Sequence, residues 1–193
     1  MNPDQLRALG RMMDVINPYF GHNPFGNCSA CSIHAARALI DGDEMVSLGD
    51  CKWEVSNFYR NPVRIDPGQD RAQRVWNWLT KHAHPGGVFI LSDGDHTFNI
   101  LRDYDGVLLL LDSNQQVYRT LNGLADCDVP LLDPDTQQMV VHNRLGPGED
   151  TLRIFHAGDL HRGFQIVAPP ARQRTASAPG VPAANFPRRN SAP

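Results

Sequence analysis

Three short runs with strand character in the middle of the chain limit its fold more than any other feature of the sequence. The runs are residues 88–91, 97–101 and 107–111, and the dipeptides Asp93-Gly94 and Asp105-Gly106 separate them. Dipeptides of this kind favour the tight turns of β-hairpins. The pattern therefore predicts three consecutive antiparallel strands. Further strand patterns follow at residues 117–120, 139–142, 152–155 and 164–167.

The residues before these strands carry helical patterns instead. Hydrophobic spacing and capping residues predict three helices, at residues 2–16, 28–40 and 70–83. Residues 43–68 are irregular, with weak strand character at residues 53–58. Helices first and antiparallel strands second predict an α+β fold, with N-terminal helices packed on an antiparallel sheet, rather than a doubly wound fold.

The composition changes near the C-terminal end of the chain. The 193 residues are enough for one domain, which we place at residues 1–167. Residues 168–193 are rich in Pro, Ala, Ser and Arg, and they predict a disordered tail that is dispensable for chemistry. Because this tail holds four arginines and no acid, the rest of the chain is more acidic than the net charge of −3. An acidic body does not fit nucleic-acid binding, which needs a basic face.

The sequence also bears on the compartment. No apolar stretch approaches the ~20 residues that span a bilayer, so we expect no membrane span. Residues 1–14 lack the basic patch and the apolar region of a secretory signal. We therefore expect a reducing, cytoplasmic environment, unless a signal-peptide-independent machine exports the protein. In that environment the chain should keep free thiols at Cys28, Cys31, Cys51 and Cys127.

Cys28 lies at the expected start of the second helix, after a loop rich in Asn, Pro, Gly and aromatic residues. A helix N-terminus carries a partial positive charge and free backbone N–H groups, which favour a thiolate and can hold an oxyanion. A thiolate is the form of cysteine that attacks a carbonyl carbon. Cys28 is thus a candidate nucleophile, and the alternative is an inert cysteine that packs at a helix start.

His96 and Asp112 are the candidate partners of Cys28. His96 opens the strand at 97–101, and Asp112 follows the strand at 107–111. Because the intervening turn makes these strands antiparallel neighbours, the start of one lies near the end of the other. We expect His96 to lie within hydrogen-bond reach of Asp112, between it and Cys28. There His96 would act as the general base and Asp112 would orient its ring, unless Asp112 only begins a turn.

Acyl transfer also needs donors for the oxyanion. The backbone N–H of Cys28 is expected to supply one donor. A polar side chain from the preceding loop would supply the second. The candidates are His22, Asn23 and Asn27, of which Asn23 and Asn27 are uncharged amide donors.

The same residues resemble the motifs of the papain-fold toxins, bacterial toxin and effector domains that include protein-glutamine deamidases. Residues 17–42, which contain Asn17-Pro18 and Asn27-Cys28-Ser29-Ala30-Cys31, are similar to the family's NP…NCxxC…A…LxG opening. Residues 87–116, which contain His96-Thr97-Phe98-Asn99-Ile100, are similar to its GHxFNVV…DG…D block. Asp95 stands in place of the usual Gly, and Asn114 stands where many members have Gln.

The resemblance implies a papain-like fold with Cys28 as nucleophile, His96 as base and Asp112 as orienting acid. It implies deamidation of a glutamine side chain through an acyl-thioester, with no cofactor and no metal. The substrate would be a protein of a target cell, whose cytoplasm this toxin or effector reaches by a signal-peptide-independent route. An immunity or inhibitor protein would be a further partner of such a toxin.

Other functions use the same residues. A cysteine protease and a transglutaminase-like acyl transferase would need the same three side chains, because both pass through an acyl-thioester. Cys28 and Cys31 could instead form half of a zinc site with Cys51 or a histidine, but structural zinc sites usually show two such pairs. A redox pair would need a strand directly upstream. A catalytically dead adaptor would have no need of all three positions.

Overall fold

The computed structural model describes residues 3–18, 27–42, 53–123, 126, 128–132, 139–143, 145 and 150–161. In these residues it contains three α-helices, α1 (Pro3–Ile16), α2 (Cys28–Asp41) and α3 (Arg71–His82). A 3-10 helix covers Val55–Asn57. The strands are β1 (Val63–Ile65), β2 (Gly87–Ser92), β3 (Thr97–Arg102), β4 (Leu108–Asp112), β5 (Val117–Leu121), β6 (Asp128–Leu132), β7 (Met139–Asn143) and β8 (Leu152–Asp159).

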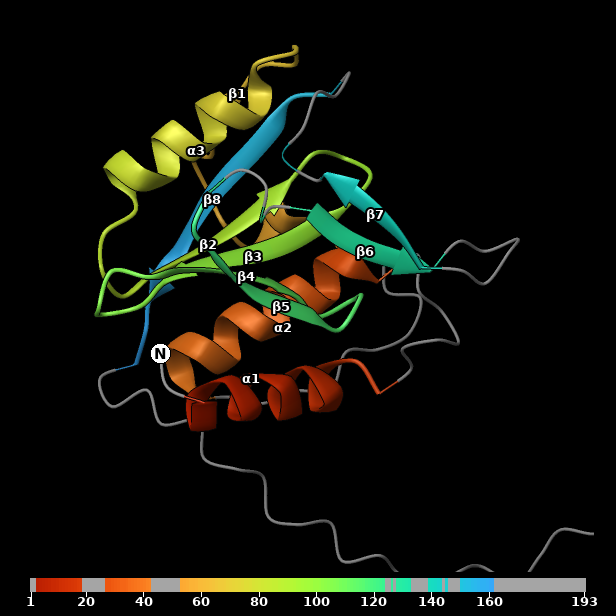
Figure 1. Cartoon of the computed structure of the whole chain (residues 1–193), viewed down its shortest axis with the longest axis vertical. Helices are drawn as coiled ribbons and strands as arrows, with labels where there is room; N and C mark the ends of the chain where they lie inside the picture. The colour runs from red at the N-terminus through yellow and green to blue at the C-terminus, as the bar shows by residue number, and fades with distance from the viewer. Residues whose placement is uncertain are drawn as a thin grey trace, which may run out of the picture.

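Six of these strands form one antiparallel sheet, in the order β1-β8-β2-β3-β4-β5. Strands β6 and β7 pair with each other in a separate two-stranded sheet. Helices α1 and α2 lie on one side of the main sheet and α3 lies on the other (Figure 1). The architecture confirms the expected α+β class, with helices packed on an antiparallel sheet.

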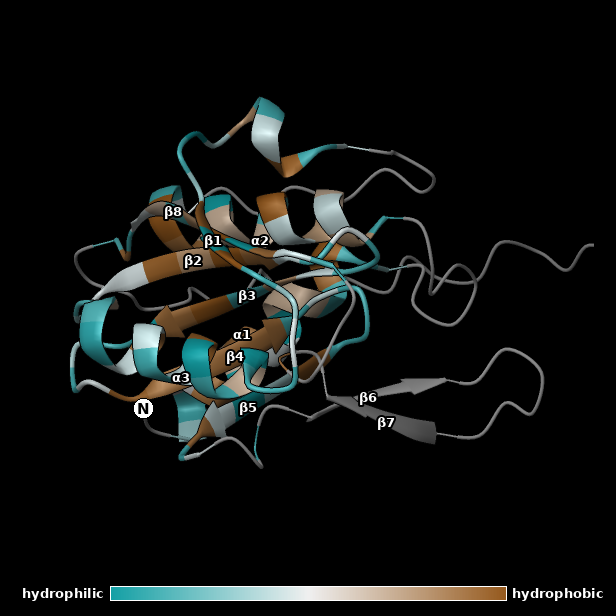
Figure 2. Cartoon of the chain, turned by 90° about the horizontal axis from the view of Figure 1, so that it is seen from above, coloured by the Kyte–Doolittle hydropathy of each residue, from teal (hydrophilic) through white to brown (hydrophobic). Residues whose placement is uncertain are grey.

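The central strands are buried on both faces. On β2, Val88 and Ile90 pack with α1 and α2, whereas Phe89 and Leu91 pack with α3. All five residues of β4 are buried. Strands covered on both faces read as continuous apolar runs rather than as alternating patterns, which is why these segments stand out in the sequence. Strands β2 and β3 are coloured hydrophobic along most of their length in Figure 2.

Most predicted elements are present, and the differences have local causes. The weak strand character at residues 53–58 was wrong, because a 3-10 helix forms there. Strands β1 and β6 were missed, and β1 is only three residues long and exists through its pairing with the distant β8. The expected strand at 164–167 and the tail at 168–193 lie outside the described residues.

None of the helices in the described part of the chain has both the length and the apolar character needed to cross a lipid bilayer.

Candidate active site

Cys28 is the first residue of α2 and is partly buried, whereas Cys31 one turn later is fully buried. The carbonyl of Asn27 accepts the first intrahelical bond, from the N–H of Cys31 at 2.9 Å. The Asn27 side chain makes no capping bond to the helix. The Asn27 side chain therefore leaves the first backbone N–H groups of α2 uncapped, and Cys28 is the first residue of this helix.

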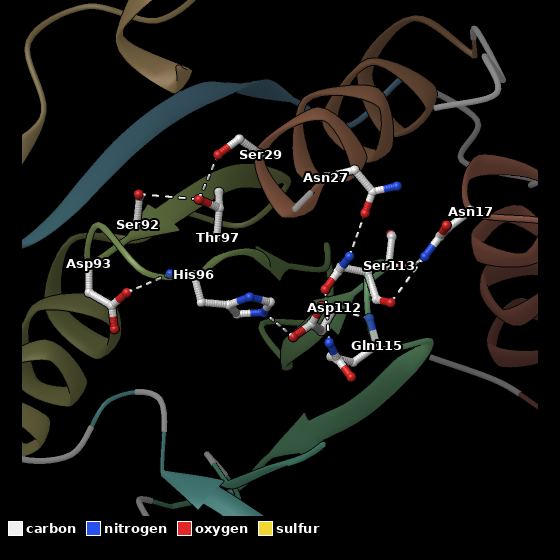
Figure 3. Close-up of polar contacts among 11 residues, drawn as sticks. Asn17, Asn27, Ser29, Ser92, Asp93, His96, Thr97, Asp112, Ser113 and Gln115 are labelled. Carbon is white, nitrogen blue, oxygen red and sulfur yellow. Dashed lines mark hydrogen bonds and ion pairs between the residues drawn. The ribbon is translucent and has the colours of Figure 1, made fainter. Parts of the chain in front are cut away.

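His96 and Asp112 lie together as the strand order predicts. The Nε2 atom of His96 is 2.6 Å from Oδ2 of Asp112 (Figure 3). Both side chains are buried, His96 at 6% and Asp112 at 0% exposure. The register explains the contact: Asn99 of β3 pairs with Leu111 of β4, so the residue before β3 lies near the end of β4. The expectation that the two side chains lie within hydrogen-bond reach is confirmed.

The buried carboxylate of Asp112 has a second donor. Its Oδ1 atom accepts a hydrogen bond from the backbone N–H of Gln115 at 3.1 Å. A buried charge is costly unless it is paired and hydrogen-bonded, and Asp112 has a partner for each oxygen. Asp112 therefore begins a turn and also contacts His96, and its role as an orienting acid stays a prediction.

His96 also controls the thiol of Cys28. Burial raises the pKa of Cys28, but the hydrogen bond and the charge of His96 lower it, and the backbone N–H of Thr97 lowers it further. The charge of Asp112 acts in the opposite direction, and the pKa of the thiol ends below its ordinary value. Since Nε2 of His96 contacts Asp112, Nδ1 is the ring nitrogen that remains for the sulfur. This order of groups favours a thiolate beside a protonated imidazole.

The loop that carries His96 is anchored from two sides. The backbone N–H of His96 donates to Oδ1 of Asp93 at 3.0 Å, and the N–H of Asp93 donates back to the carbonyl of His96. The buried Arg71 at the start of α3 lies 3.9 Å from Oδ2 of Asp93 and donates to the carbonyl of Asp150 at 2.9 Å. Sequence analysis treated Asp93 only as a turn residue and missed Arg71, which lies on α3, away from both motifs.

Hydroxyl groups join the start of α2 to the sheet. Ser29 Oγ lies 3.0 Å from Thr97 Oγ1, and Thr97 Oγ1 donates to Ser92 Oγ at 3.2 Å (Figure 3). One helical turn further, Nδ2 of Asn99 donates to the carbonyl of Ser32 at 3.0 Å. These contacts hold the start of α2 against the start of β3 and the end of β2. They therefore also hold Cys28 in place relative to His96.

A chain of side-chain amides holds the turn that follows Asp112. Asn17 Nδ2 donates to the carbonyls of Ser113 at 3.2 Å and Asn114 at 3.0 Å. Asn114 Nδ2 donates to Oδ1 of Asn27, and Gln115 Nε2 donates to Oδ1 of Asn114. The turn is thus attached to the end of α1 and to the residue before α2. Asn114, which departs from the papain-fold toxin pattern, is a full member of this network.

Asn17→Ala should lower the free energy of unfolding by about 2 kcal/mol, because two buried carbonyls lose their donor. Urea unfolding should show a lower midpoint with an unchanged slope. Asn57→Ala is the matched control, since Asn57 is exposed and its change should cost under about 0.5 kcal/mol. Equal midpoints for the two variants would mean that the network does not hold the turn.

The oxyanion candidates are only partly described. The amide of Asn27 is buried; its oxygen accepts from Asn114, and its nitrogen has no partner among the described residues. In Figure 3 this nitrogen points away from His96. His22 and Asn23 lie outside the described residues. A donor role for any of the three therefore stays a prediction, and the visible contact of Asn27 is with the turn at 113–115.

Two adjoining cavities lie beside the start of α2 and the loop that carries His96. One, of about 400 Å³, is lined by Trp53, Glu54, Val55, Ser56, Phe155, Ser29, Ser92, Gly94 and Arg153. The other, of about 570 Å³, shares Gly94 and Arg153 and is further lined by Arg64, Asp93, Asp95, Asp150 and Thr151. Together they give a polar groove with both signs of charge, which begins at the neighbour of Cys28.

Cys28 and Cys31 are the two cysteines within the described residues. Cys28 and Cys31 are free thiols, and Cys51 and Cys127 lie outside the described residues. In the described ranges, neither Cys28 nor Cys31 belongs to a group of three side chains that could hold a metal ion. Cys31 points into the core cluster that α1 and α2 form with the sheet, as expected for a residue one turn into the helix.

The chain matches no protein-family model, and neither a curated protein nor a solved structure is significantly similar to it. A functional assignment therefore has to come from the geometry of Cys28, His96 and Asp112.

Proposed function

We propose that the protein is a papain-like cysteine hydrolase in which Cys28 is the nucleophile, His96 the general base and acid, and Asp112 the orienting carboxylate. The observation that carries the proposal is the 2.6 Å contact between buried Asp112 and buried His96, next to the partly buried thiol of Cys28. The lowered pKa of Cys28 supports it, because only the thiolate is nucleophilic. The two chemical roles of His96 require a ring held in one orientation, and Asp112 can provide that.

The reaction follows from these positions. The thiolate of Cys28 attacks the carbonyl carbon of a carboxamide, and the resulting oxyanion faces the first backbone N–H groups of α2. His96 protonates the leaving nitrogen, the C–N bond of the tetrahedral intermediate breaks, and ammonia departs as the acyl-thioester forms. Water then loses a proton to His96 and attacks the thioester carbon. The C–S bond breaks, which releases a carboxylate and restores the thiol.

The proposed substrate is a glutamine side chain of a protein in a target cell, and the proposed context is a bacterial toxin or effector. Two considerations favour this substrate and this context. The motifs around Cys28 and His96 resemble those of papain-fold toxins. The groove beside Ser29 and Gly94 is polar and carries both charges, which suits a surface segment of a protein better than an apolar small molecule.

Intact-mass spectrometry and peptide mapping of proteins from a recipient cell, after incubation with the enzyme, test this function. Deamidation should add about one dalton at a glutamine, with ammonia released in equal amount. Cys28→Ala is the matched negative control. New peptide termini would identify a protease, and crosslinked products would identify an acyl transferase. If no mass change depends on Cys28, the proposed hydrolase is wrong.

A further inference from the structure

A bulge in β8 brings two metal-ligating side chains to one face of the sheet. Phe89 of β2 pairs with His156, Val88 pairs with Gly158, and Gly87 pairs with Asp159. One extra residue of β8 is therefore inserted between the two strands. Residues three apart on a regular strand point to opposite faces. Because of the extra residue, His156 and Asp159 lie opposite two positions of β2 that share a face.

Local contacts hold the bulge in place. Gly158 has a φ of 152°, and a Cβ atom there would lie 2.9 Å from Ile40 on α2. The positive φ favours glycine at this position, and a side chain there would also displace the end of Ile40. Gly158 therefore favours the bulge that places His156 and Asp159 on one face.

His84 completes the group from the loop between α3 and β2. Its Nε2 lies 2.7 Å from Oδ1 of Asp159, and Nε2 of His156 lies 3.5 Å from the same oxygen. The loop is held by backbone bonds of Gly86, whose N–H donates to the carbonyl of Arg102 and whose carbonyl accepts from the N–H of Leu160, each at 2.7 Å. These two backbone hydrogen bonds therefore hold the loop that places His84 next to Asp159.

The rings of both histidines also contact the ring of Phe89. Phe89 lies with its ring centroid 6.2 Å from that of His84 and 5.3 Å from that of His156. The three polar side chains remain exposed to solvent, at 49% for His84, 52% for His156 and 68% for Asp159.

We propose that His84, His156 and Asp159 form a binding site for a divalent transition metal ion, with zinc as the ion that the donor set fits best. Candidate ligand atoms of the three residues all lie within 4.8 Å of one another. Zinc bonds of about 2.0–2.2 Å in a tetrahedron place ligand atoms about 3.3 Å apart, so small side-chain rotations suffice. Two imidazoles and one carboxylate suit zinc rather than calcium or magnesium, which prefer oxygen ligands.

This site is separate from the candidate active site. It lies at the Gly87 end of β2, whereas the loop that carries His96 leaves the Ser92 end of the same strand. Five strand steps separate the two ends by about 17 Å. A zinc ion there would join the α3–β2 loop to the end of β8, so its expected effect is on stability.

Zinc titration of the full chain tests the proposal. The protein carries no histidine tag, is treated with a chelator, and has Cys28→Ala to remove thiol binding at the other site. Calorimetry with zinc chloride should show binding that falls at least about 100-fold in His156→Ala and in His84→Gln. Zinc at about 100 times its dissociation constant should raise the melting temperature by about 5 °C in the parent and not in these variants.

His161→Ala is the matched control, because His161 is exposed and its backbone contacts Leu39 on the other side of the sheet. It should bind zinc as the parent does. Cobalt should give the visible absorption of a site without sulfur. The proposal is overturned by zinc binding that is equal in the parent and both cluster variants, by the absence of binding in the parent, or by a thiolate-to-cobalt absorption band.

Discussion

Cys28→Ala is expected to reduce turnover by at least about 10⁴-fold while leaving the fold intact. The reason is that alanine cannot form the acyl-thioester, and the residue is only partly buried at the start of α2, so its loss removes little packing. Hydrolysis of a small chromogenic thioester and modification of a recipient-cell protein are the two measurements. Circular dichroism should be unchanged.

Cys31→Ala is the control that separates thiol chemistry from metal binding. Cys31 is fully buried one turn into α2 and packs in the core, so this variant should keep most of its activity per folded molecule. Equal loss of activity in both variants, together with release of zinc, would instead favour the Cys-x-x-Cys metal site. Full activity of Cys28→Ala would rule out the proposed nucleophile.

His96→Ala should have the second-largest effect, a loss of about 10²–10⁴-fold in turnover. It should also move the pH dependence of Cys28 alkylation by iodoacetamide to higher pH. The sign follows from the contacts: burial raises the pKa of Cys28 and would remain, whereas the hydrogen bond and charge of His96 lower it and would be lost. The thiolate would then form only at higher pH. Peptide mapping measures the reaction at Cys28 alone.

Asp112→Asn tests the role of the carboxylate separately. The substitution keeps the volume and an acceptor for the N–H of Gln115, so the turn should persist. Turnover should fall by less than in His96→Ala, because Asp112 orients the ring and does not transfer the proton. A greater loss in Asp112→Asn, with normal folding, would contradict the division of roles proposed here.

The order of the elements could be predicted from the sequence because each predicted element depends on local patterns. Strands β2 and β4 are apolar runs, β3 has strand character, and Asp-Gly turns separate the three. Helix α2 is capped by Gly42 in the left-handed conformation that glycine favours. The closeness of His96 and Asp112 could also be predicted, because one hairpin connects them. In an antiparallel pair the start of β3 lies beside the end of β4.

The support around these residues could not be predicted, because it joins positions far apart in the chain. Arg71 reaches Asp93 and Asp150, and Asn17 reaches the turn after Asp112 across nearly a hundred residues. No local pattern marks a buried arginine or asparagine as a partner of a distant carbonyl. The proposed metal site of His84, His156 and Asp159 could not be predicted either. A one-residue bulge in β8 reverses the side-chain alternation that sequence spacing implies. Local chemistry thus determines which side chains can react, and long-range backbone pairing decides which of them meet.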